Sequence, residues 1–370
     1  MDTHYHHGEM NVGNAIVNMA QDFVGSNNLP YLEPVGQFGT RHKGGSDHAS
    51  HRYIFTKLQS WVKYAFPEAD LPVLEYNNVD GHIVEPHHFV PIIPTLLING
   101  ASGIGTGWAT DIPKYNPVDV IDAVLGNINE LKPWYRGFTG IVGKNFTRGK
   151  YSIEDGRMVI EDLPIGCWTS NFKEKLKKLE KHYMRFTEEH TDTTVKFVIH
   201  GLNGTDWISK LPLEARIKEN WVVFENNRIR KTDLTNVFSD HADARLELYK
   251  KRKQHQLDVL QSDINEKTNR MKFIVHALAG DIPITSSNYE ACVQRCNELS
   301  IDSKYLDIRL RDITTDAVKK LERDIEELKQ KHIILTNTTE QQMWIKELEE
   351  LKNHLQPTNK RKREEIDLTD

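Results

Sequence analysis

The sequence predicts an α+β fold followed by a long helical arm, and three observations lead to this prediction. The 370 residues exceed what one compact core usually holds, so two or three domains are expected. Up to about residue 234, glycine, proline, aromatic and β-branched residues alternate with short helical patterns. Beyond that point glycine and proline become scarce, and charged helical patterns dominate.

The first region, residues 1–138, is expected to combine helices with glycine-rich loops. Apolar residues at helical spacing predict one helix over 11–24, which ends at a Gly-Ser-Asn-Asn stop signal. Similar spacing over 53–62 predicts a second helix. The apolar run 88–98 is typical of a buried strand.

The next region, residues 139–234, is expected to form a smaller α+β unit. Two apolar stretches, Met158–Ile160 and Val195–Ile199, have the β-branched and alternating character of strands. The sequence therefore predicts a second, separate unit before the long helices begin.

The last folded region, residues 235–356, is expected to form an arm. One helix is predicted over 235–278, followed by a small helical knob and by two returning helices, which begin near Thr315 and after Thr339. A compact helical bundle is the alternative. Residues 357–370 are too polar to fold and are expected to be a disordered tail.

Composition excludes several classes of protein. The net charge of −5 rules out a basic coat over the whole surface, so any nucleic-acid contact must be a local patch. Three cysteines are too few for a disulfide scaffold and suit a reducing compartment. The longest apolar stretch is interrupted by Pro91 and Pro94 and is too short to span a membrane.

A histidine cluster lies near the N-terminus, in the segment His4-Tyr5-His6-His7-Gly8-Glu9. Three imidazoles and a carboxylate within six residues are chemically able to bind a metal. The spacing, however, matches no helical ligand pair such as His-Glu-x-x-His. Contact with phosphates or bases, and a purely structural or solvated role, are the alternatives for these residues.

A basic, glycine-rich segment runs from Gly36 to Tyr53. Between residues 41 and 57 the local charge is +3, from four basic residues against one acid: Arg41, Lys43, Arg52 and Lys57 against Asp47. Glycines allow the backbone to approach a phosphate, and arginine offers two parallel N–H donors to it. This segment is therefore the kind of local basic patch that is still possible in a chain with a net charge of −5.

Tyr53 follows Arg52 at the end of this segment. A free phenol has a pKa near 10 and is a weak nucleophile, but an adjacent guanidinium would stabilise both the phenolate and a pentavalent phosphate. A packing role in the core is the alternative for this tyrosine.

A second glycine-rich segment, residues 99–108, is neither a P-loop nor a dinucleotide-binding fingerprint. It places a single isoleucine, Ile104, between two glycines. An exposed isoleucine on such a turn adds nothing to its own fold, but it can act as an apolar wedge between stacked base pairs.

Together these segments resemble the cleavage–religation core of type IIA DNA topoisomerases, in the form found in eukaryotes and large DNA viruses. The resemblance covers nearly the whole chain, and its motifs stand in family order. They are Tyr-His-His-Gly-Glu at 5–9, Phe-Val-Gly-Ser-Asn-Asn at 23–28, Gly-Gln-Phe-Gly-Thr-Arg at 36–41, Arg-Tyr-Ile-Phe-Thr at 52–56, Gly-Ile-Gly-Thr-Gly-Trp at 103–108, Pro-Trp-Tyr-Arg-Gly-Phe-Thr-Gly at 133–140 and Leu-Pro-Ile-Gly-Cys-Trp-Thr at 163–169.

The resemblance implies a domain for each region. Residues 1–138 would be a partial winged-helix domain for DNA cleavage, and residues 139–234 a tower-like domain. Residues 235–356 would be a coiled-coil arm with a small helical exit-gate domain, through which two copies form a homodimer.

The resemblance also implies roles for individual residues. Tyr53 would attack a DNA phosphodiester to form a 5′-phosphotyrosyl link, Arg52 would stabilise the transition state, and Ile104 would bend the DNA. Eight further residues would contact the double-stranded DNA, the first five along the cleaved strand and the last three along its arms: Tyr5, His6, His7, Arg41 and Lys43, then Lys210, Arg216 and Lys218.

Cofactors are implied for the complete enzyme only. The family uses Mg²⁺ and ATP, but the Glu and Asp-x-Asp carboxylates that hold its metal do not occur in this sequence. The metal-binding and ATPase domains are therefore expected on a missing segment or on a separate chain, and no metal site is expected here. A catalytically inert module for DNA binding and dimerisation is the alternative.

Location follows from the resemblance and from the tail. The resemblance and the basic residues 360–363 suggest the nucleus, and a cytoplasmic viral replication site is the second possibility.

Overall fold

The computed structural model describes residues 5, 7–128, 130–154, 156–180, 185–200, 208–225, 228–284 and 288–356. His4, His6 and the tail 357–370, which figure in the sequence predictions, lie outside the described residues. The chain divides into two compact units. Unit 1 comprises Met1–Glu68, Leu74–Arg245 and Ile345–Asp370, and unit 2 comprises Ala69–Val73 and Leu246–Trp344.

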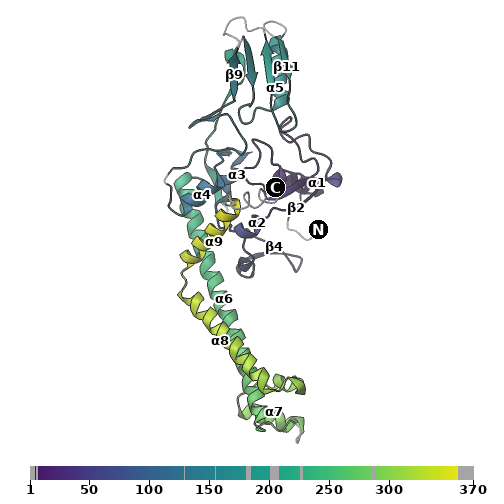
Figure 1. Cartoon of the computed structure of the whole chain (residues 1–370), viewed down its shortest axis with the longest axis vertical. Coiled ribbons are helices and arrows are strands. Elements are labelled where there is room, and N and C mark those ends of the chain that lie inside the picture. The colour runs from purple at the N-terminus through teal and green to yellow at the C-terminus, as the bar shows by residue number, and fades with distance from the viewer. Residues whose placement is uncertain are drawn as a thin grey trace, which may run out of the picture. The chain divides into compact units, whose positions relative to one another are not determined.

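Short helices are distributed along unit 1 (Figure 1). They are α1 (Glu9–Ala20), η1 (His51–Tyr53), α2 (Val62–Ala65), α3 (Thr95–Asn99), α4 (Pro117–Val124), α5 (Thr169–Glu180) and η3 (Ile208–Lys210), while η2 (Glu68–Val73) lies at the unit boundary. The helix expected over 11–24 is therefore present but ends earlier, because Gln21 has extended backbone angles. At α4, the Asn116 side chain accepts a hydrogen bond from the Val118 N–H and caps the helix.

The strands of unit 1 form small sheets, and every pairing between the named strands of the described residues is antiparallel. Four are two-stranded: β1 (Leu32–Val35) with β2 (Phe55–Leu58), β3 (Tyr76–Val79) with β4 (His82–Pro86), β5 (Ala101–Gly105) with β6 (Trp108–Ile112), and β14 (Val222–Glu225) with β15 (Arg228–Lys231). Helices and antiparallel strands are mixed, so the α+β class predicted from the sequence is confirmed.

Two larger sheets occupy the region that follows α4. One has the order β13 (Glu214–Arg216), β8 (Phe146–Arg148), β7 (Ile141–Val142). The other has the order β11 (Arg185–Glu188), β12 (Phe197–His200), β10 (Arg157–Ile160), β9 (Tyr151–Glu154). The strands predicted at 158–160 and 195–199 are therefore present as β10 and β12.

Helix α5 packs on the four-stranded sheet (Figure 1). Its buried residues Phe172 and Leu176 are four apart and so lie on one face of the helix. They meet alternate residues of β10 and β12, and the Phe172 and Phe197 rings lie 5.2 Å apart. Leu163 also belongs to this cluster, and its carbonyl accepts a hydrogen bond from Arg41 of the basic segment 36–53.

Two sequence predictions about local structure are wrong. The helix expected over 53–62 is absent, because residues 55–58 form β2 and pair with β1, with Leu58 opposite Leu32. Ile54, Phe55 and Thr56 are β-branched or aromatic and favour a strand once a partner strand is available. A short helix, α2, begins only at Val62.

The second wrong prediction is the buried strand over 88–98. The segment is buried, with Ile92, Ile93, Leu97 and Ile98 almost fully covered, but its first part is irregular and its second part is helix α3. Pro91 and Pro94 lack the N–H that a strand ladder needs, which explains why no strand forms.

Side chains from the C-terminal half of the chain hold this segment inside unit 1. His241, on α6 (Leu234–Leu278), is 2.8 Å from the Pro91 carbonyl oxygen through Nε2, and Arg245 donates to the Val90 carbonyl at 2.8 Å. On α9 (Glu340–Leu355), Lys352 contacts Asp122 at 2.6 Å. The irregular backbone of residues 90–91 is thus satisfied by side chains.

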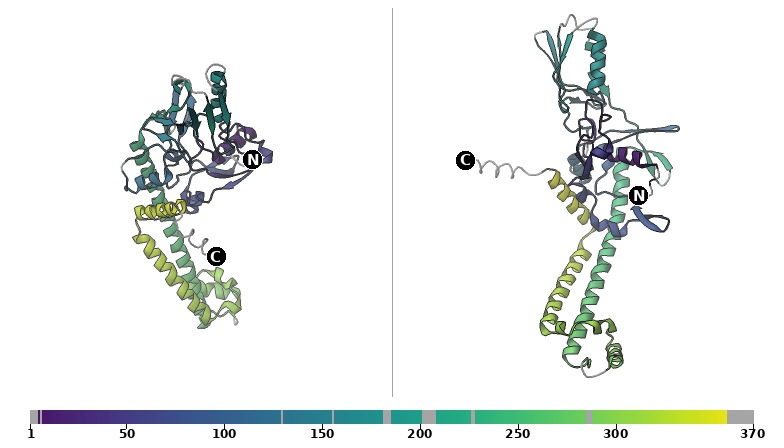
Figure 2. Two further views of the ribbon diagram at one scale, coloured as in Figure 1. Left: turned by 45° about the horizontal axis from the view of Figure 1, so that its top comes forward. Right: turned by 90° about the vertical axis from the view of Figure 1, so that its right-hand side faces the viewer.

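Unit 2 is built on two antiparallel helices, the greater part of α6 and α8 (Thr315–Asn337), which lie side by side in Figures 1 and 2. Lys267 contacts Asp324 at 3.0 Å, and Lys253 donates to the Thr338 carbonyl at 2.7 Å. The predicted long helix and the two returning helices are therefore confirmed as α6, α8 and α9.

Short helices gather where α6 ends and α8 begins. They are α7 (Tyr289–Glu298), η4 (Ser303–Asp307) and η5 (Leu310–Asp312). Their core contains Phe273, Ile274, Cys296 and Tyr305. None of the helices in the described part of the chain combines the length and hydropathy that a membrane span needs.

Candidate nucleic-acid interface

Tyr53 stands at the end of η1, with 67% of its surface exposed. The backbone is extended at Ile54 after it, and the Tyr53 N–H donates to the Ser50 carbonyl at 2.9 Å. The guanidinium carbon of Arg52 lies 5.0 Å from the centre of the Tyr53 ring. The phenol and the guanidinium that the sequence singled out are therefore adjacent, and such exposure does not fit a packing role within the described chain.

Helix α1 supports this turn directly. The His51 Nε2 lies 3.1 Å from Asn14 Oδ1 on α1, and the His51 ring stacks on the His48 ring with 5.7 Å between centres. A Cβ at Gly13 would come within 2.3 Å of the His51 ring, so this close approach needs glycine. Tyr53 is thus carried on a turn that is fixed from both sides.

Two residues of the histidine cluster, Tyr5 and His7, precede α1. Tyr5 and His7 are both exposed, and their rings meet edge to face with 5.1 Å between centres. They place a phenol and an imidazole close together, just before the helix that supports Tyr53.

Hydrogen bonds to the Asp47 carboxylate close the glycine-rich loop before Tyr53. Asp47 accepts from the Thr40 N–H at 2.9 Å and from the Thr40 hydroxyl at 2.5 Å. Burial alone would raise the pKa of Asp47, but these hydrogen bonds outweigh it and lower the pKa. Gly39 has φ 96°, and a Cβ there would lie 2.6 Å from Gly45. The loop is therefore a fixed, closed turn.

The two basic residues of this loop are placed differently. Lys43 is exposed, whereas Arg41 is buried and its Nη2 lies 2.5 Å from Asp162 Oδ1 and 2.8 Å from the Leu163 carbonyl oxygen. The side chains of both Arg41 and Asp162 are at most 7% exposed. Arg41 is thus held by the protein itself, and its predicted contact with DNA phosphates remains a prediction.

Asp162 was not identified from the sequence. Its second oxygen accepts from the Thr139 N–H at 2.7 Å and from the Thr139 hydroxyl at 2.8 Å, while Oδ1 also accepts from the Leu163 N–H at 2.9 Å. Asp162 thus joins the buried Arg41 to Thr139 and Leu163 through a network of hydrogen bonds. Nothing in the surrounding sequence distinguishes this aspartate from a surface residue.

Ile104 projects from the hairpin formed by β5 and β6. It pairs with Ala109, one step before the two-residue turn Thr106-Gly107, and 94% of its surface is exposed. Gly107 has φ 75°, which the turn requires. The glycines on either side of Ile104 leave it without neighbours in its own strand, so the hairpin presents one bare apolar side chain.

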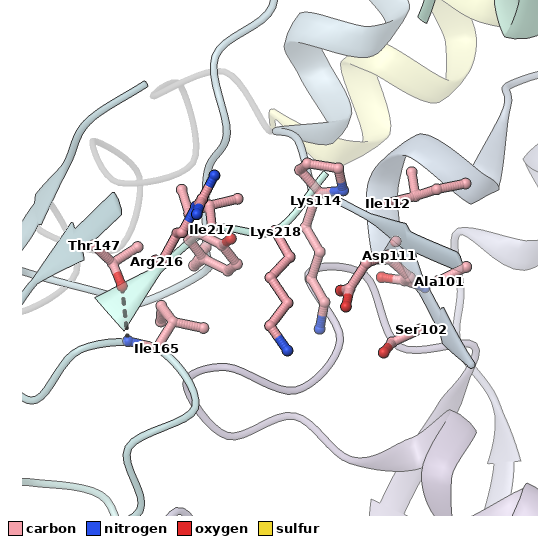
Figure 3. A pocket seen from close by; sticks show the side chains of 14 residues that line it. Ala101, Ser102, Asp111, Ile112, Lys114, Thr147, Ile165, Arg216, Ile217 and Lys218 are labelled. Atoms are coloured by element: carbon pink, nitrogen blue, oxygen red, sulfur yellow. Dashed lines mark hydrogen bonds between the residues drawn. The ribbon is translucent and has the colours of Figure 1, made fainter. Parts of the chain in front are cut away.

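The base of this hairpin borders a pocket of about 410 Å³ (Figure 3). Ser102 and Asp111 line it from the hairpin, and Arg216 and Lys218 line it from β13 and the residues after it. In Figure 3 the amino groups of Lys114 and Lys218 point in the same direction, toward Asp111 and Ser102. Three cations against one carboxylate make this pocket suitable for an anion such as a phosphate.

Lys114 is the member of this pocket that sequence analysis missed. Its Nζ donates to the Gly25 carbonyl at 3.1 Å and to the Ser26 carbonyl, and burial lowers the pKa of Lys114 to about 8. It ties the hairpin base to the loop after α1. The only sequence signal was a lysine next to a proline, which is too common to be informative.

The three residues assigned to the DNA arms lie in one stretch. Lys210 ends η3 and is exposed, while Arg216 and Lys218 are exposed at the pocket. Lys210 does not line the pocket. The structure therefore brings Arg216 and Lys218 together with Lys114, beside the hairpin that carries Ile104.

No metal centre is found among the described residues. In the parts of the chain from residue 7 to 356 that the structure describes, no three His, Cys, Asp or Glu side chains converge as a metal site would need. The side chains of these described segments thus do not form a site for a catalytic magnesium ion.

The sequence and the structure are similar to known proteins. A family model for DNA gyrase/topoisomerase IV matches residues 1–349. DNA topoisomerase 2, mitochondrial, of Dictyostelium discoideum is 33% identical over 97% of this chain and 31% of its own length. DNA topoisomerase 2 of Trypanosoma cruzi is 35% identical over 93% of this chain and 30% of its own length. The chain thus spans about a third of the length of the relatives it matches.

A solved structure matches almost the whole chain. It is the crystal structure of the Plasmodium falciparum topoisomerase II DNA-binding, cleavage and re-ligation domain, with a TM-score of 0.84 and 29% sequence identity. The match covers 99% of this chain and 57% of the other.

Proposed function

The chain belongs to the DNA gyrase/topoisomerase IV family, and from this membership we propose that it is the breakage–reunion portion of a type IIA DNA topoisomerase. In this role it makes a transient double-strand break in one duplex, so that another can pass and DNA topology changes. The observation on which the proposal depends is the exposed Tyr53 phenol beside the Arg52 guanidinium, on a turn that α1 holds in place.

The chemical step is a transesterification. The Tyr53 oxygen attacks a backbone phosphorus, forms a bond to it and loses the phenol proton. At the same time the bond from phosphorus to the 3′ oxygen breaks, and that oxygen takes up a proton, so the step is proton-neutral. The product is a 5′-phosphotyrosyl link and a free 3′ hydroxyl. Arg52 stabilises the added negative charge on the phosphorus centre. Resealing is the reverse reaction and needs no new high-energy bond.

Contacts with the rest of the duplex follow from the arrangement of the other predicted residues. Tyr5 and His7 are exposed just before α1, and Lys43 is exposed in the loop before Tyr53. All three contact the cleaved strand. Ile104 enters the minor groove and bends the duplex, while Arg216 and Lys218 hold phosphates at the hairpin base. Arg41, which is already paired with Asp162, contributes by shaping the loop as well as by its charge.

Domain roles are part of the same proposal. Residues 1–138 act as the partial winged-helix domain, and residues 139–234, with the four-stranded sheet and α5, act as the tower-like domain. Residues 235–356 act as the coiled-coil arm and the exit gate, where two copies of the chain meet as a homodimer.

Magnesium and ATP belong to the complete enzyme in this proposal. Type II topoisomerases of this family use both, and magnesium supplies charge stabilisation at the phosphate and at the leaving oxygen. Because the described residues do not converge on a metal, the ligands come from carboxylates on another segment or another chain. We place the protein in the nucleus or at a cytoplasmic viral replication site.

The experiment mixes this chain with a polypeptide that carries the family's metal-binding domain, magnesium and supercoiled DNA, and then denatures the mixture with detergent. Protein covalently attached to a DNA 5′ end is expected with the native sequence. Tyr53→Phe lacks the attacking oxygen and should abolish the adduct, whereas Tyr151→Phe, at an exposed tyrosine of β9, should leave it unchanged.

The result that would overturn the proposal is equally specific. If Tyr53→Phe still forms the adduct, the nucleophile lies elsewhere. If DNA is bound but no adduct forms with any such partner, the chain is a binding and dimerisation module instead of an enzyme portion.

A further inference from the structure

A second exposed apolar pair lies on the hairpin formed by β14 and β15. Phe224 and Ile229 are direct cross-strand partners, and they are 71% and 46% exposed. An exposed phenylalanine at the end of a two-stranded hairpin adds little to the stability of its own fold. The mechanism proposed above gives neither residue a role.

The hairpin is held firmly against the rest of unit 1. Arg230 pairs with Glu225 at 2.7 Å and also contacts Asp240 on α6. The Thr110 hydroxyl donates to the Val222 carbonyl at 2.9 Å, and Asp111 and Asn220 exchange backbone hydrogen bonds of 2.9 and 2.8 Å. The two hairpins are separate two-stranded sheets, and the bridge between Asp111 and Asn220 connects them at the base of β6 and β14.

This connection puts the two apolar projections on one face. Side chains alternate between the faces of a strand, and partners across antiparallel strands share a face. Ile104 pairs with Ala109, two residues before Asp111, and Phe224 lies four residues after Asn220. Ile104, Phe224 and Ile229 thus belong to the same face, and the two hairpins project in the same direction in the right-hand view of Figure 2.

The charge of the β14–β15 hairpin suits DNA. Residues 222–231 carry a net charge of +2, from three basic residues against one acid: Arg228, Arg230 and Lys231 against Glu225. Lys231 is exposed and, as the partner of Val222, lies on the face of Phe224, whereas the exposed Arg228 is the partner of Glu225 and lies on the other face. The cationic pocket with Lys114 and Lys218 is lined by Ser102 and Asp111, which belong to this same face. An apolar pair between cations is the pattern of a minor-groove contact, in which apolar side chains touch the bases and cations hold the flanking phosphates.

We propose that the β14–β15 hairpin is a second duplex-DNA contact, in which Phe224 lies in the minor groove next to the base step that Ile104 opens. The proposal rests on the DNA-binding function proposed above and adds a new contact residue to it. Ile229 supports the Phe224 ring from the neighbouring strand. Arg230 is a positioning residue, because its two carboxylate contacts fix the angle of the hairpin.

Photocrosslinking tests the contact directly. A photoreactive benzophenone amino acid replaces Phe224, Ile104 or Ile83 in three versions of the full chain, and each is irradiated with a labelled linear duplex. Ile83 is the matched control, because it is 74% exposed on a different hairpin, β3–β4. Crosslinks at positions 224 and 104 but not at 83 are expected.

Each other outcome has a defined meaning. A crosslink at 104 without one at 224 overturns the second contact and leaves the DNA-binding function standing. No crosslink at either position overturns both. A crosslink at 83 as strong as at 224 shows that the contact is unspecific and also overturns the proposal.

Binding measurements identify the chemistry of the contact. Phe224→Ala should weaken the affinity for the duplex roughly tenfold without changing its dependence on salt, because the lost contact is apolar. Lys231→Ala should instead reduce the slope of log K against log salt by about 1. If Phe224→Ala binds DNA normally but alters self-association in sedimentation, a second copy of the chain covers this face and the proposal is wrong.

Discussion

The segment that carries Tyr53 contains a buried cation, and a half-buried cation follows the hairpin that carries Ile104, but the two cations have different kinds of partner. Arg41, in the Tyr53 segment, has a carboxylate partner, Asp162, at 2.5 Å. Lys114, at the end of the hairpin, donates to two backbone carbonyls, and burial lowers its pKa to about 8. Arg41 is thus paired with a carboxylate, whereas Lys114 has only neutral carbonyl oxygens to offset its burial.

The different partners of Arg41 and Lys114 suggest that the Tyr53 segment and the Ile104 hairpin have different structural requirements. In the proposed reaction the turn around Tyr53 keeps one geometry during bond breaking and resealing, and the buried Arg41–Asp162 pair gives rigidity to the loop before it. The hairpin needs only to present an apolar tip, and its own backbone pairing is sufficient. Three predictions test this comparison, from the largest expected effect on stability to the smallest.

The largest effect is expected from Asp162→Ala. The substitution leaves the buried Arg41 guanidinium without its charge partner and removes the acceptor of Thr139, so the free energy of unfolding should fall by about 3–5 kcal/mol. Chemical denaturation measures it. Glu161→Ala is the matched control, since the neighbouring Glu161 pairs with Lys150 at the surface and should change stability little. Equal losses in the two variants would contradict the role given to Asp162.

A pH effect is expected from Lys114. Its pKa in the folded chain, about 8, lies below the ordinary value of 10.5, so the unfolded chain binds more protons between these pH values. Stability therefore rises with pH across this window, by about 3 kcal/mol in total for this group. Subtracting the pH profile of Lys114→Met from that of the native chain isolates the effect, because the other titrating groups cancel. A flat difference between pH 8 and 10 would show that the lysine is not desolvated.

The smallest effect on stability is expected from Ile104→Ala. With 94% of the side chain already exposed, little apolar area is lost, and the free energy of unfolding should change by less than about 0.5 kcal/mol. DNA bending, measured by energy transfer between dyes on the two duplex ends, should decrease markedly. Normal DNA bending by this variant would show that Ile104 is not a wedge, and the hairpin would then have no assigned role in DNA binding.

Prediction from sequence succeeded where the signal is local and repeated. The apolar spacing of α6, α8 and α9 is sustained over several turns, and the isolated Ile104 between glycines led to a bare, projecting side chain. It failed at residues 53–62, where apolar spacing fits both a helix and a strand, and pairing with β1 decides the outcome. Propensity is weak enough for such tertiary contacts to override it.

Burial of charged residues was the second limit. Arg41 and Lys43 are two positions apart in one basic loop, yet one is buried and the other is exposed. The difference comes from Asp162, which is far away in the sequence and has no distinctive neighbours. Lys114 was missed for the same reason, because its partners Gly25 and Ser26 contribute only backbone oxygens, which no pattern of side chains reveals.

The pairing of Arg41 with Asp162 also has a consequence for how the protein is made. The two residues are 121 positions apart, and the Leu163 carbonyl that Arg41 also contacts is one further on. On a ribosome, the Tyr53 turn leaves the exit tunnel well before its anchor has been synthesised, and closing so long a loop is a late, entropically costly step. The Arg41 loop that precedes Tyr53 therefore reaches its final geometry only after residues 162–163, next to the four-stranded sheet, have been synthesised.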